Sequence, residues 1–467
     1  MNKNLISSLV MLLFSCFLMA QNSEITGSWK GAIFVGNDHL NLMLHIRAQS
    51  NGLTATLDSP DQMALGIPVE SVDFTNDTLV LKLPALQAGY QGILINKNQI
   101  EGRWTQAGMT FDLNLFRITD ETEGPLRPQL PVPPYPYATE EVSIQNPNTG
   151  VTLAGTLTIP RGRGPHPAIL LISGSGPQNR DEEIAGHKPF LVLADFLTRN
   201  GIATLRYDDR GVAGSSGAFE GATTVDFMHD AEAAFQYLLA QGRIDRNRCG
   251  LVGHSEGGMI AQMMAASQKK VRFIVLLAAP GVPTHELMLT QARLIAKTQG
   301  ASENEIKFSG ESNSAIFDIL RNENDLDVAR ELVNIEMERL AENLSGQDTA
   351  RKSMLTEQLI SGVESVFTPW FLFFINYDPA EYLSNVKCPV LALNGGKDVQ
   401  VEAISNLEAI KHTLEASGNK QVTTKLFPEL NHLFQTAKTG APREYAQIEE
   451  TFSEEAMQLI SDWIKKR

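Results

Sequence analysis

From about residue 138 onward, short apolar runs alternate with segments of helical spacing. Runs such as AILLI (168–172) and FIVLLAA (273–279) are almost continuously apolar, as expected of strands buried on both faces. Strands that alternate with helices predict a mostly parallel sheet, so this region is expected to be an α/β domain. Eight strands are predicted, at residues 140–146, 151–160, 166–176, 201–209, 249–255, 271–281, 388–396 and 422–429.

The alternation is interrupted between the sixth and seventh strands. About 100 residues (283–385) intervene there, although connections of this kind are normally much shorter. Their spacing predicts helices at 286–297, 326–343 and 352–365. Ligands bind at the carboxyl ends of strands in open α/β sheets, so an insertion at this end is expected to form a helical cap over the site. The remaining catalytic domain would comprise 139–282 and 386–467.

The pentapeptide G-x-S-x-G occupies residues 253–257, directly after an apolar strand and before a helix-compatible segment. A serine at so sharp a strand-to-helix turn is held in strained geometry, and side chains at Gly253 and Gly257 would clash there. Ser255 is therefore predicted to be a nucleophile. The alternative is a glycine-rich turn that carries a surface serine.

A serine hydroxyl needs a base within hydrogen-bond reach. In this arrangement the acid and then the histidine follow the serine along the chain. Of the three histidines beyond Ser255, His285 begins the insertion and His412 lies in a polar helical segment. His432 lies in a loop just after the last predicted strand, where the base is expected.

The acid is expected at the end of the strand that follows the insertion. Asp398 lies there, past the turn at Gly395-Gly396, and would hold the tautomer of His432. Aspartate is also common in ordinary turns, which is the structural alternative. Glu402 and Asp378 are the competing candidates, although Asp378 falls within the insertion.

The oxyanion of the reaction needs two donors. One is predicted to be the backbone N–H of Glu256, directly after the nucleophile. The other is assigned to the backbone N–H of Ser175, in the loop after the third strand, because Pro177 has none. The alternative is that the backbone N–H of Gly176, one residue later, is this second donor.

Two charged segments lie near strand ends. Residues 179–183 (NRDEE) follow the oxyanion loop and fit either a charged rim or a substrate contact. Asp209 and Arg210 follow the fourth strand; they are interpreted as holding their loop through ion pairs rather than as binding a substrate carboxylate.

Residues 139–467 resemble bacterial carboxylesterases of the α/β-hydrolase fold, including those related to serine aminopeptidases. The resemblance rests on SGSGPQNRDE (173–182), YDDRGVAGSSG (207–217), GHSEGG (253–258), NGGKD (394–398) and LNHLF (430–434). It implies a triad of Ser255, Asp398 and His432, an acyl-enzyme, and no metal or cofactor. Ser173 departs from the lipase-type pattern, which has histidine there, and this leaves the second oxyanion donor open.

The substrate class follows less directly from the sequence. The insertion contains a strongly apolar aromatic stretch at 366–374 (VFTPWFLFF), which suits either an acyl or aryl pocket or packing within the cap. A small-molecule ester substrate, with a short acyl or an aryl group, is preferred over a peptide by analogy with the fold. A serine peptidase or aminopeptidase and a non-catalytic binding protein are the alternatives.

The amino-terminal part reads as strands and turns. Alternating segments at 40–46, 78–84 and 111–118, with the motif I-x-G-x-W at both 25–29 and 100–104, predict an antiparallel, barrel-like β domain over 21–122. It looks like the accessory domain of some secreted members of the family. The proline-rich stretch 123–138 predicts a semi-rigid linker, or a strap laid over the next domain.

The first residues predict export. Lys3 and the apolar stretch 5–19, followed by Ala20, have the pattern of a signal peptide over 1–20, with periplasmic or extracellular delivery. Cys16 is the basis of a less favoured lipoprotein alternative. No later apolar run is long enough for a membrane span. The net charge of −15, without a basic run, argues against nucleic-acid partners. The oligomeric state is left open.

Overall fold

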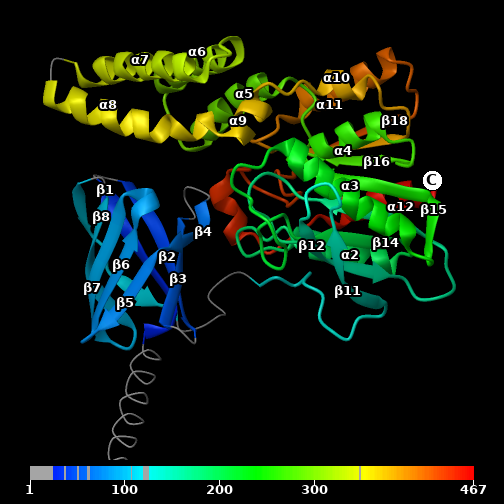
Figure 1. Ribbon diagram of the computed structural model, residues 1–467, viewed down its shortest axis with the longest axis horizontal. Helices are drawn as coiled ribbons and strands as arrows, with labels where there is room; N and C mark the ends of the chain where they lie inside the picture. Colours follow the sequence, from blue (N-terminus) through cyan, green and yellow to red (C-terminus); the bar gives the residue numbers. More distant parts are fainter. Residues whose placement is uncertain are drawn as a thin grey trace, which may run out of the picture. The chain divides into compact units, whose positions relative to one another are not determined.

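The computed structural model of the 467-residue chain describes residues 25–35, 38–49, 52–59, 64–106, 108–118, 126–346 and 349–467. The predicted signal peptide, including Cys16, lies outside the described residues. The chain divides into two compact units between Leu126 and Arg127. In Figure 1 the first unit is coloured in blue shades and the second runs from cyan to red.

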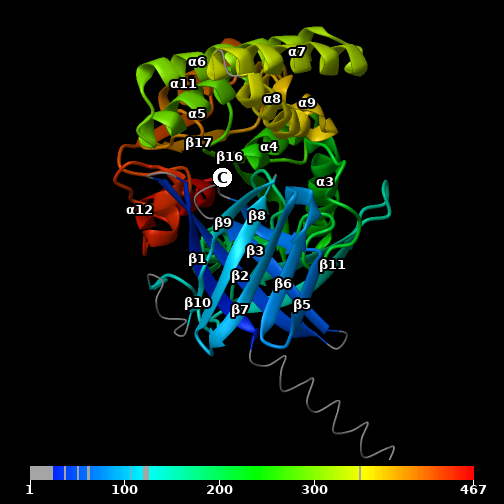
Figure 2. The same ribbon diagram turned by 90° about the vertical axis from the view of Figure 1, so that its left-hand side faces the viewer.

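Among its described residues, the first unit forms one antiparallel sheet of ten strands in the order β4-β3-β2-β1-β10-β8-β7-β6-β5, with β9 paired to β8. Strand β3 contacts β5 and β4 contacts β6, so the sheet nearly closes into a barrel (Figure 2). Its elements are β1 (Gly27–Val35), β2 (Asp38–Gln49), β3 (Gly52–Ser59), β4 (Ala64–Val69), β5 (Ser71–Thr75), β6 (Thr78–Leu83), the 3-10 turn η2 (Pro84–Leu86), β7 (Ala88–Asn96), β8 (Gln99–Gln106), β9 (Met109–Asp112) and β10 (Leu115–Arg117).

The repeated I-x-G-x-W motif supplies part of the core of this unit. Trp29 and Trp104 are both buried among the apolar side chains of the sheet. The strand predicted at 111–118 is divided into β9 and β10. At the break the backbone N–H of Gly102 donates to the Asn114 side chain (3.3 Å) and the carbonyl of Leu113 accepts the Tyr90 hydroxyl (3.2 Å), so these two backbone groups do not pair with each other.

The second unit contains an eight-stranded sheet in the order β11-β12-β14-β13-β15-β16-β17-β18. Strand β12 is antiparallel to β11 and β14, and all other pairs are parallel. Each of the eight predicted strands corresponds to one of these. They are β11 (Ala138–Gln145), β12 (Thr152–Ile159), β13 (His166–Ile172), β14 (Ala203–Tyr207), β15 (Ile244–His254), β16 (Ile274–Leu277), β17 (Val390–Gly395) and β18 (Val422–Phe427).

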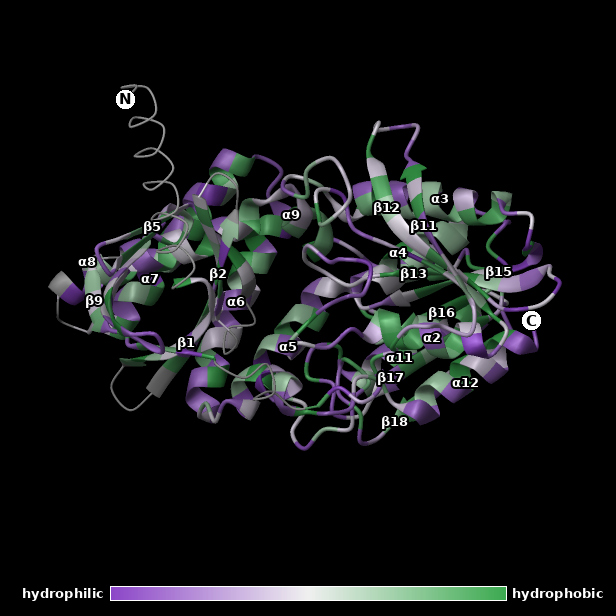
Figure 3. Ribbon diagram, turned by 90° about the horizontal axis from the view of Figure 1, so that it is seen from below, coloured by the Kyte–Doolittle hydropathy of each residue, from purple (hydrophilic) through white to green (hydrophobic). Residues whose placement is uncertain are grey.

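Helices cover both faces of this sheet and bury it in two apolar layers. Helices α3, α4 and α11 pack on one face, and α2 and α12 pack on the other. Strand β16 is hydrophobic throughout, whereas β15 is hydrophobic and buried only in its second half (Figure 3), as the apolar runs predict. The arrangement confirms the α/β-hydrolase fold. The helices are α2 (Pro189–Arg199), α3 (Thr224–Ala240), α4 (Glu256–Ser267), α11 (Ala403–Ala416), α12 (Glu454–Lys465) and the 3-10 turn η4 (Pro442–Gln447).

A group of helices lies between β16 and β17 in the chain. Helices α6, α7 and α8 lie side by side (Figures 1 and 2). The predicted helices match α5, α7 and α8, whereas α6, α9 and α10 are additional. The group comprises α5 (Thr284–Thr298), α6 (Glu303–Asn322), α7 (Leu326–Ser345), α8 (Thr349–Val363), the 3-10 turn η3 (Glu364–Phe367), α9 (Pro369–Ile375) and α10 (Pro379–Leu383). We refer to α5–α10 as the cap.

No single helix of the described chain has the length and apolarity needed to cross a membrane. One helix pair in the cap, Arg351–Phe367 with Pro369–Ile375, passes that test only when its two parts are counted together across a 77° bend.

The proline-rich stretch is attached to the second unit from Arg127 onward. The Arg127 guanidinium donates to the carbonyl of Ile448 (2.5 Å), and the side-chain amide of Gln129 donates to the carbonyl of Phe452 (2.7 Å). This part of the predicted linker is therefore a strap fastened to the carboxyl-terminal segment of its own unit.

Candidate active site

Ser255 lies at a sharp turn between a strand and a helix. Strand β15 ends at His254, helix α4 begins at Glu256, and Ser255 itself has φ 53° and ψ −118°. A positive φ is costly for a residue with a side chain, so the surroundings must hold it in place. The flanking glycines make this possible. A Cβ on Gly253 would lie 2.1 Å from the carbonyl oxygen of Gly257, and one on Gly257 would lie 2.1 Å from that of Ile172.

Gly257→Ala is expected to move the start of α4. The new methyl group would meet the backbone of β13, which cannot yield easily, so we expect a loss of about 1–3 kcal/mol in the free energy of unfolding, or more. The activity should fall as well, because Ser255 precedes the displaced turn. Urea unfolding and kcat measure the two effects. Gly310→Ala in α6 is the control, since a Cβ there has no neighbour within 4 Å. An unchanged unfolding midpoint in Gly257→Ala would contradict the steric argument.

The structure brings Asp398 and His432 together. Nδ1 of His432 lies 2.8 Å from Oδ2 of Asp398, and both residues are buried. The other carboxylate oxygen, Oδ1, accepts the backbone N–H groups of Gln400 (2.8 Å) and Val401 (2.9 Å). The carboxylate is therefore fixed in orientation, and it holds one edge of the imidazole.

The competing acids lie elsewhere. The Glu402 side chain caps helix α11 by accepting the backbone N–H groups of Ile404 and Ser405. Asp378 caps helix α10 within the cap. Both side chains have the usual role of an N-cap, which satisfies free N–H groups at the start of a helix.

A buried asparagine shapes the His432 loop. The side-chain oxygen of Asn431 accepts the backbone N–H groups of Leu433 (3.0 Å) and Gln435 (2.9 Å), and its amide donates to the Gln435 side chain. Sequence reasoning missed Asn431, although its place beside His432 in a loop was a signal for such a turn.

The loop 173–178, which we call the oxyanion loop, is held in place by buried acidic side chains. The backbone N–H of Gly174 donates to Oε1 of Glu182 (2.8 Å). Asp209 accepts the hydroxyl of Ser173 (3.2 Å) and the backbone N–H of Gln178 (2.9 Å). Burial is the main cause that raises the pKa of Asp209 well above its ordinary value. Asp209 thus anchors this loop by hydrogen bonds rather than by the ion pair expected from the sequence.

The other charged side chains near these loops form ion pairs. Arg210 contacts Asp230 (2.6 Å), as expected for a residue that holds its loop. Arg180 contacts Asp208 (2.8 Å). Glu182 differs from its neighbours in the segment 179–183, because it is buried beneath the oxyanion loop. It is therefore not part of a charged rim.

The side chain of Glu256 is buried beside the nucleophile and connects three elements. Its Oε1 accepts the hydroxyl of Thr224 (2.6 Å), at the start of α3, and the indole N–H of Trp370 (2.9 Å), in cap helix α9. The Ser175 hydroxyl also hydrogen-bonds to it. Burial raises the pKa of Glu256, although these three donors offset part of the effect. The cap is thus tied to the residue that follows Ser255.

A cavity of about 210 Å³ contains the predicted catalytic groups. Ser255, His432, Ser175 and Glu256 line it, whereas Asp398 lies behind His432. The cap contributes an apolar wall of Leu287 and Met288 from α5 and Trp370 and Phe374 from α9. The aromatic stretch is therefore divided between two roles, because its residues Phe367 and Phe371 pack inside the cap instead.

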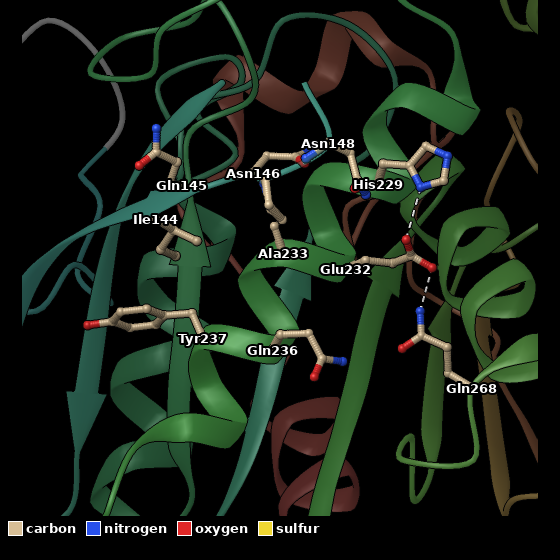
Figure 4. Close-up of a pocket in the computed structure, with 11 residues that line it drawn as sticks. Ile144, Gln145, Asn146, Asn148, His229, Glu232, Ala233, Gln236, Tyr237 and Gln268 are labelled. Atoms are coloured by element: carbon tan, nitrogen blue, oxygen red, sulfur yellow. Dashed lines mark hydrogen bonds and ion pairs between the residues drawn. The ribbon is translucent and has the colours of Figure 1, made fainter. Parts of the chain in front are cut away.

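A second hollow, of about 520 Å³, lies between the end of β11 and helix α3 (Figure 4). Two of its titratable side chains, His229 and Glu232, contact each other. Nδ1 of His229 lies 2.9 Å from Glu232, which also accepts the side-chain amide of Gln268 (2.5 Å). Ser255 does not line this hollow, so the candidate active site is the smaller cavity. Among the described residues, no group of three or more His, Cys, Asp or Glu could hold a metal ion.

Comparisons with known proteins show which family the chain is similar to. The family model described as "Serine aminopeptidase, S33" matches residues 188–436. Esterase EstD of Thermotoga maritima is 29% identical over 294 residues, which are 63% of this chain and 61% of EstD. An uncharacterized 31.7 kDa protein of Escherichia coli is 26% identical over 252 residues, 53% of this chain and 77% of its own. The chain thus spans less than two thirds of the length of EstD.

Among solved structures, the Pyrococcus furiosus esterase Pf2001 is similar at 15% identity and a TM-score of 0.43, covering 74% of this chain and 99% of its own. The acylaminoacyl peptidase of Pyrococcus horikoshii is similar at 12% identity and a TM-score of 0.43, covering 94% of this chain and 66% of its own. With the family match over residues 188–436, the chain belongs to the serine aminopeptidase S33 family of hydrolases.

Proposed function

We propose that the protein is a carboxylesterase that cleaves short-chain acyl or aryl esters through an acyl-enzyme on Ser255. The observation that carries this proposal is the cavity that Ser255 and His432 share with apolar side chains of the cap. Its volume of about 210 Å³ suits a small acyl or aryl group. An apolar wall opposite a nucleophile favours such a group, because its burial from water is favourable.

In the proposed reaction, Asp398 orients His432, and His432 transfers the protons that let Ser255 react. Because Asp398 contacts Nδ1 of His432, Nε2 is left to accept the proton of the Ser255 hydroxyl as its oxygen attacks the ester carbonyl carbon. The tetrahedral intermediate then breaks its bond to the alcohol oxygen, which takes that proton from His432. Water, deprotonated by the same nitrogen, attacks the acyl carbon, and release of the carboxylic acid returns the proton to Ser255.

The oxyanion would receive the backbone N–H groups of Glu256 and Ser175. Glu256 begins helix α4, whose N-terminal end favours negative charge. For the second donor, Gly174 is excluded because its N–H is engaged by Glu182. Ser175 lines the cavity, which supports its assignment over that of Gly176.

The polar lining of the cavity favours an ester over the amino terminus of a peptide. An aminopeptidase needs a carboxylate that is available to bind the ammonium group of its substrate. The carboxyl groups that line this cavity, Glu182 and Glu256, already accept hydrogen bonds from the protein. The name of the relative EstD, an esterase, agrees with this preference.

A fluorophosphonate probe and a substrate panel test the proposal. The probe should label the purified protein once, at Ser255, as located by mass spectrometry of its peptides. The kcat/KM should be higher for p-nitrophenyl acetate and butyrate than for aminoacyl-p-nitroanilides. Absence of the label would contradict a serine hydrolase mechanism. Labelling with a higher kcat/KM on the anilides would instead assign the site to a peptidase.

A further inference from the structure

His254, the residue before the nucleophile, has a buried ring whose two nitrogens both contact oxygen atoms. Nδ1 lies 2.9 Å from Oε1 of Glu182, and Nε2 lies 3.0 Å from the backbone carbonyl oxygen of His432. His254 and Glu182 are each buried. The proposed mechanism assigns neither residue a role.

The partners of His254 determine where its protons lie. A backbone carbonyl can only accept, so Nε2 must carry a proton. Oε1 of Glu182 already accepts the backbone N–H of Gly174 at 2.8 Å, which makes this oxygen an acceptor toward Nδ1 as well. Both ring nitrogens then carry protons, and His254 is an imidazolium ion paired with the Glu182 carboxylate.

We propose that the buried ion pair of His254 and Glu182 positions the oxyanion loop and the His432 loop against the nucleophile turn. The inference rests on the proposed function and concerns positioning residues, not an additional triad. Through Glu182 the pair holds the backbone of Gly174, next to the proposed donor Ser175. Through Nε2 it holds the backbone of His432 itself.

The geometry couples the two loops through one ring. The rings of His254 and His432 lie 4.7 Å apart between centroids. Gly174 is so close that a Cβ on it would lie 3.3 Å from the Cβ of Ser255 and 3.5 Å from Nδ1 of His254. A small shift of either loop would therefore change the distance from Ser255 to its donors, and misplacement by about 1 Å can cost about 10²-fold in rate.

The charge of His254 depends on the groups that face it. Burial opposes the charge, but Glu182, the His432 carbonyl and Asp398 together raise the pKa of His254 above its ordinary value of 6.5. Two further acidic residues, Asp209 and Glu256, lie near this ion pair. Asp209 interacts electrostatically with both Glu256 and Glu182. Because the folded pKa is raised, the stabilisation is fully present below pH 6.5 and is lost as pH rises through the folded pKa. We expect kcat to decline on the alkaline side for this reason.

Glu182→Gln tests the ion pair with little change of shape. The glutamine oxygen keeps the bond from Gly174, but a neutral His254 has one ring proton and must lose one of its two bonds. We expect kcat on p-nitrophenyl butyrate to fall about 10- to 100-fold, with KM changed by less than about threefold. The alkaline decline of kcat should disappear, which loss of packing alone would not cause. Glu183→Gln is the matched control, because its half-exposed carboxylate contacts Lys188 (3.4 Å) and lies outside the cavity.

The protonation state can be read directly by NMR of the full chain labelled with ¹⁵N-histidine. At pH 6, below the ordinary pKa of 6.5, His254 should show two protonated ring nitrogens, assigned by the loss of its signals in His254→Gln, and one in Glu182→Gln. A single protonated nitrogen in the wild type, or wild-type kcat and pH dependence in Glu182→Gln, would overturn the proposal. If the two ring protons are seen while the fluorophosphonate probe fails to label Ser255, the ion pair stands and the proposed function fails.

Discussion

Replacement of Ser255 by alanine is expected to lower kcat for p-nitrophenyl esters by about 10⁵-fold or more. In the proposed mechanism the Ser255 oxygen is the atom that becomes bonded to the acyl group, and the residual rate of the variant would come from the oxyanion donors and substrate binding. Alanine meets the same positive φ as serine, so the fold should be kept. Steady-state kcat with protein purified free of other esterases measures the effect, and the fluorophosphonate label should be lost.

Ser267→Ala is the control for this change. Ser267 ends the same helix, α4, and its hydroxyl donates to the backbone carbonyl of Met263 (3.1 Å), away from the cavity. Its replacement should leave kcat within about twofold. Retention of most of the activity in Ser255→Ala would refute the nucleophile assignment, together with the acyl-enzyme.

The parts of this fold that the sequence predicts are those governed by local pattern. Near-continuous apolar runs identify inner strands such as β13, β16 and β17, because a strand buried on both faces has no polar face. The edge strands β11 and β18 are largely polar, and their prediction rests on the alternation of strands with turns and helices. The ends of the strands then order the candidate residues: Ser255 after β15, Asp398 after β17 and His432 after β18. Parallel strands end at one edge of a sheet, so residues far apart in the chain are expected to lie near each other there.

The missed helices of the cap had local signals of another kind. Helix α6 begins with a capping box, in which the Ser302 hydroxyl accepts the backbone N–H of Glu305 and the Glu305 side chain accepts that of Ser302. Helix α9 begins at Pro369 after the N-cap Thr368. Hydrophobic periodicity alone does not predict these two helices, because α9 is short and α6 has many polar residues. Their capping residues do indicate where each helix begins.

The other contacts of the site join residues that are far apart in the chain, and hydrophobic periodicity carries no information about such contacts. The partners of His254 are 72 and 178 residues away in the chain, and Trp370 meets Glu256 across 114 residues. A buried glutamate and an exposed one also look alike in a sequence. For this reason the segment 179–183 could be interpreted as a charged rim, although Glu182 lies beneath the oxyanion loop.

Asp398→Asn should have the second largest effect, a fall in kcat of about 10⁴-fold. Oδ1 of Asp398 accepts two backbone N–H groups, from Gln400 and Val401, so the oxygen of an asparagine would occupy this position. Its NH₂ group would then face Nδ1 of His432 and donate to it. His432 would be forced to carry its proton on Nε2, where it cannot accept the proton of Ser255. The side chain has nearly the same shape, so the unfolding midpoint should change little.

Glu402→Gln provides the matched comparison, since Glu402 is the acid that competes with Asp398 in the sequence. It caps α11 rather than contacting His432, and an amide oxygen can still accept from that helix, so kcat should stay within about threefold of the wild type. The rate of fluorophosphonate labelling should fall only in Asp398→Asn, because labelling also needs the base to accept the Ser255 proton. The opposite pattern, with loss in Glu402→Gln and activity kept in Asp398→Asn, would transfer the role of the acid to Glu402.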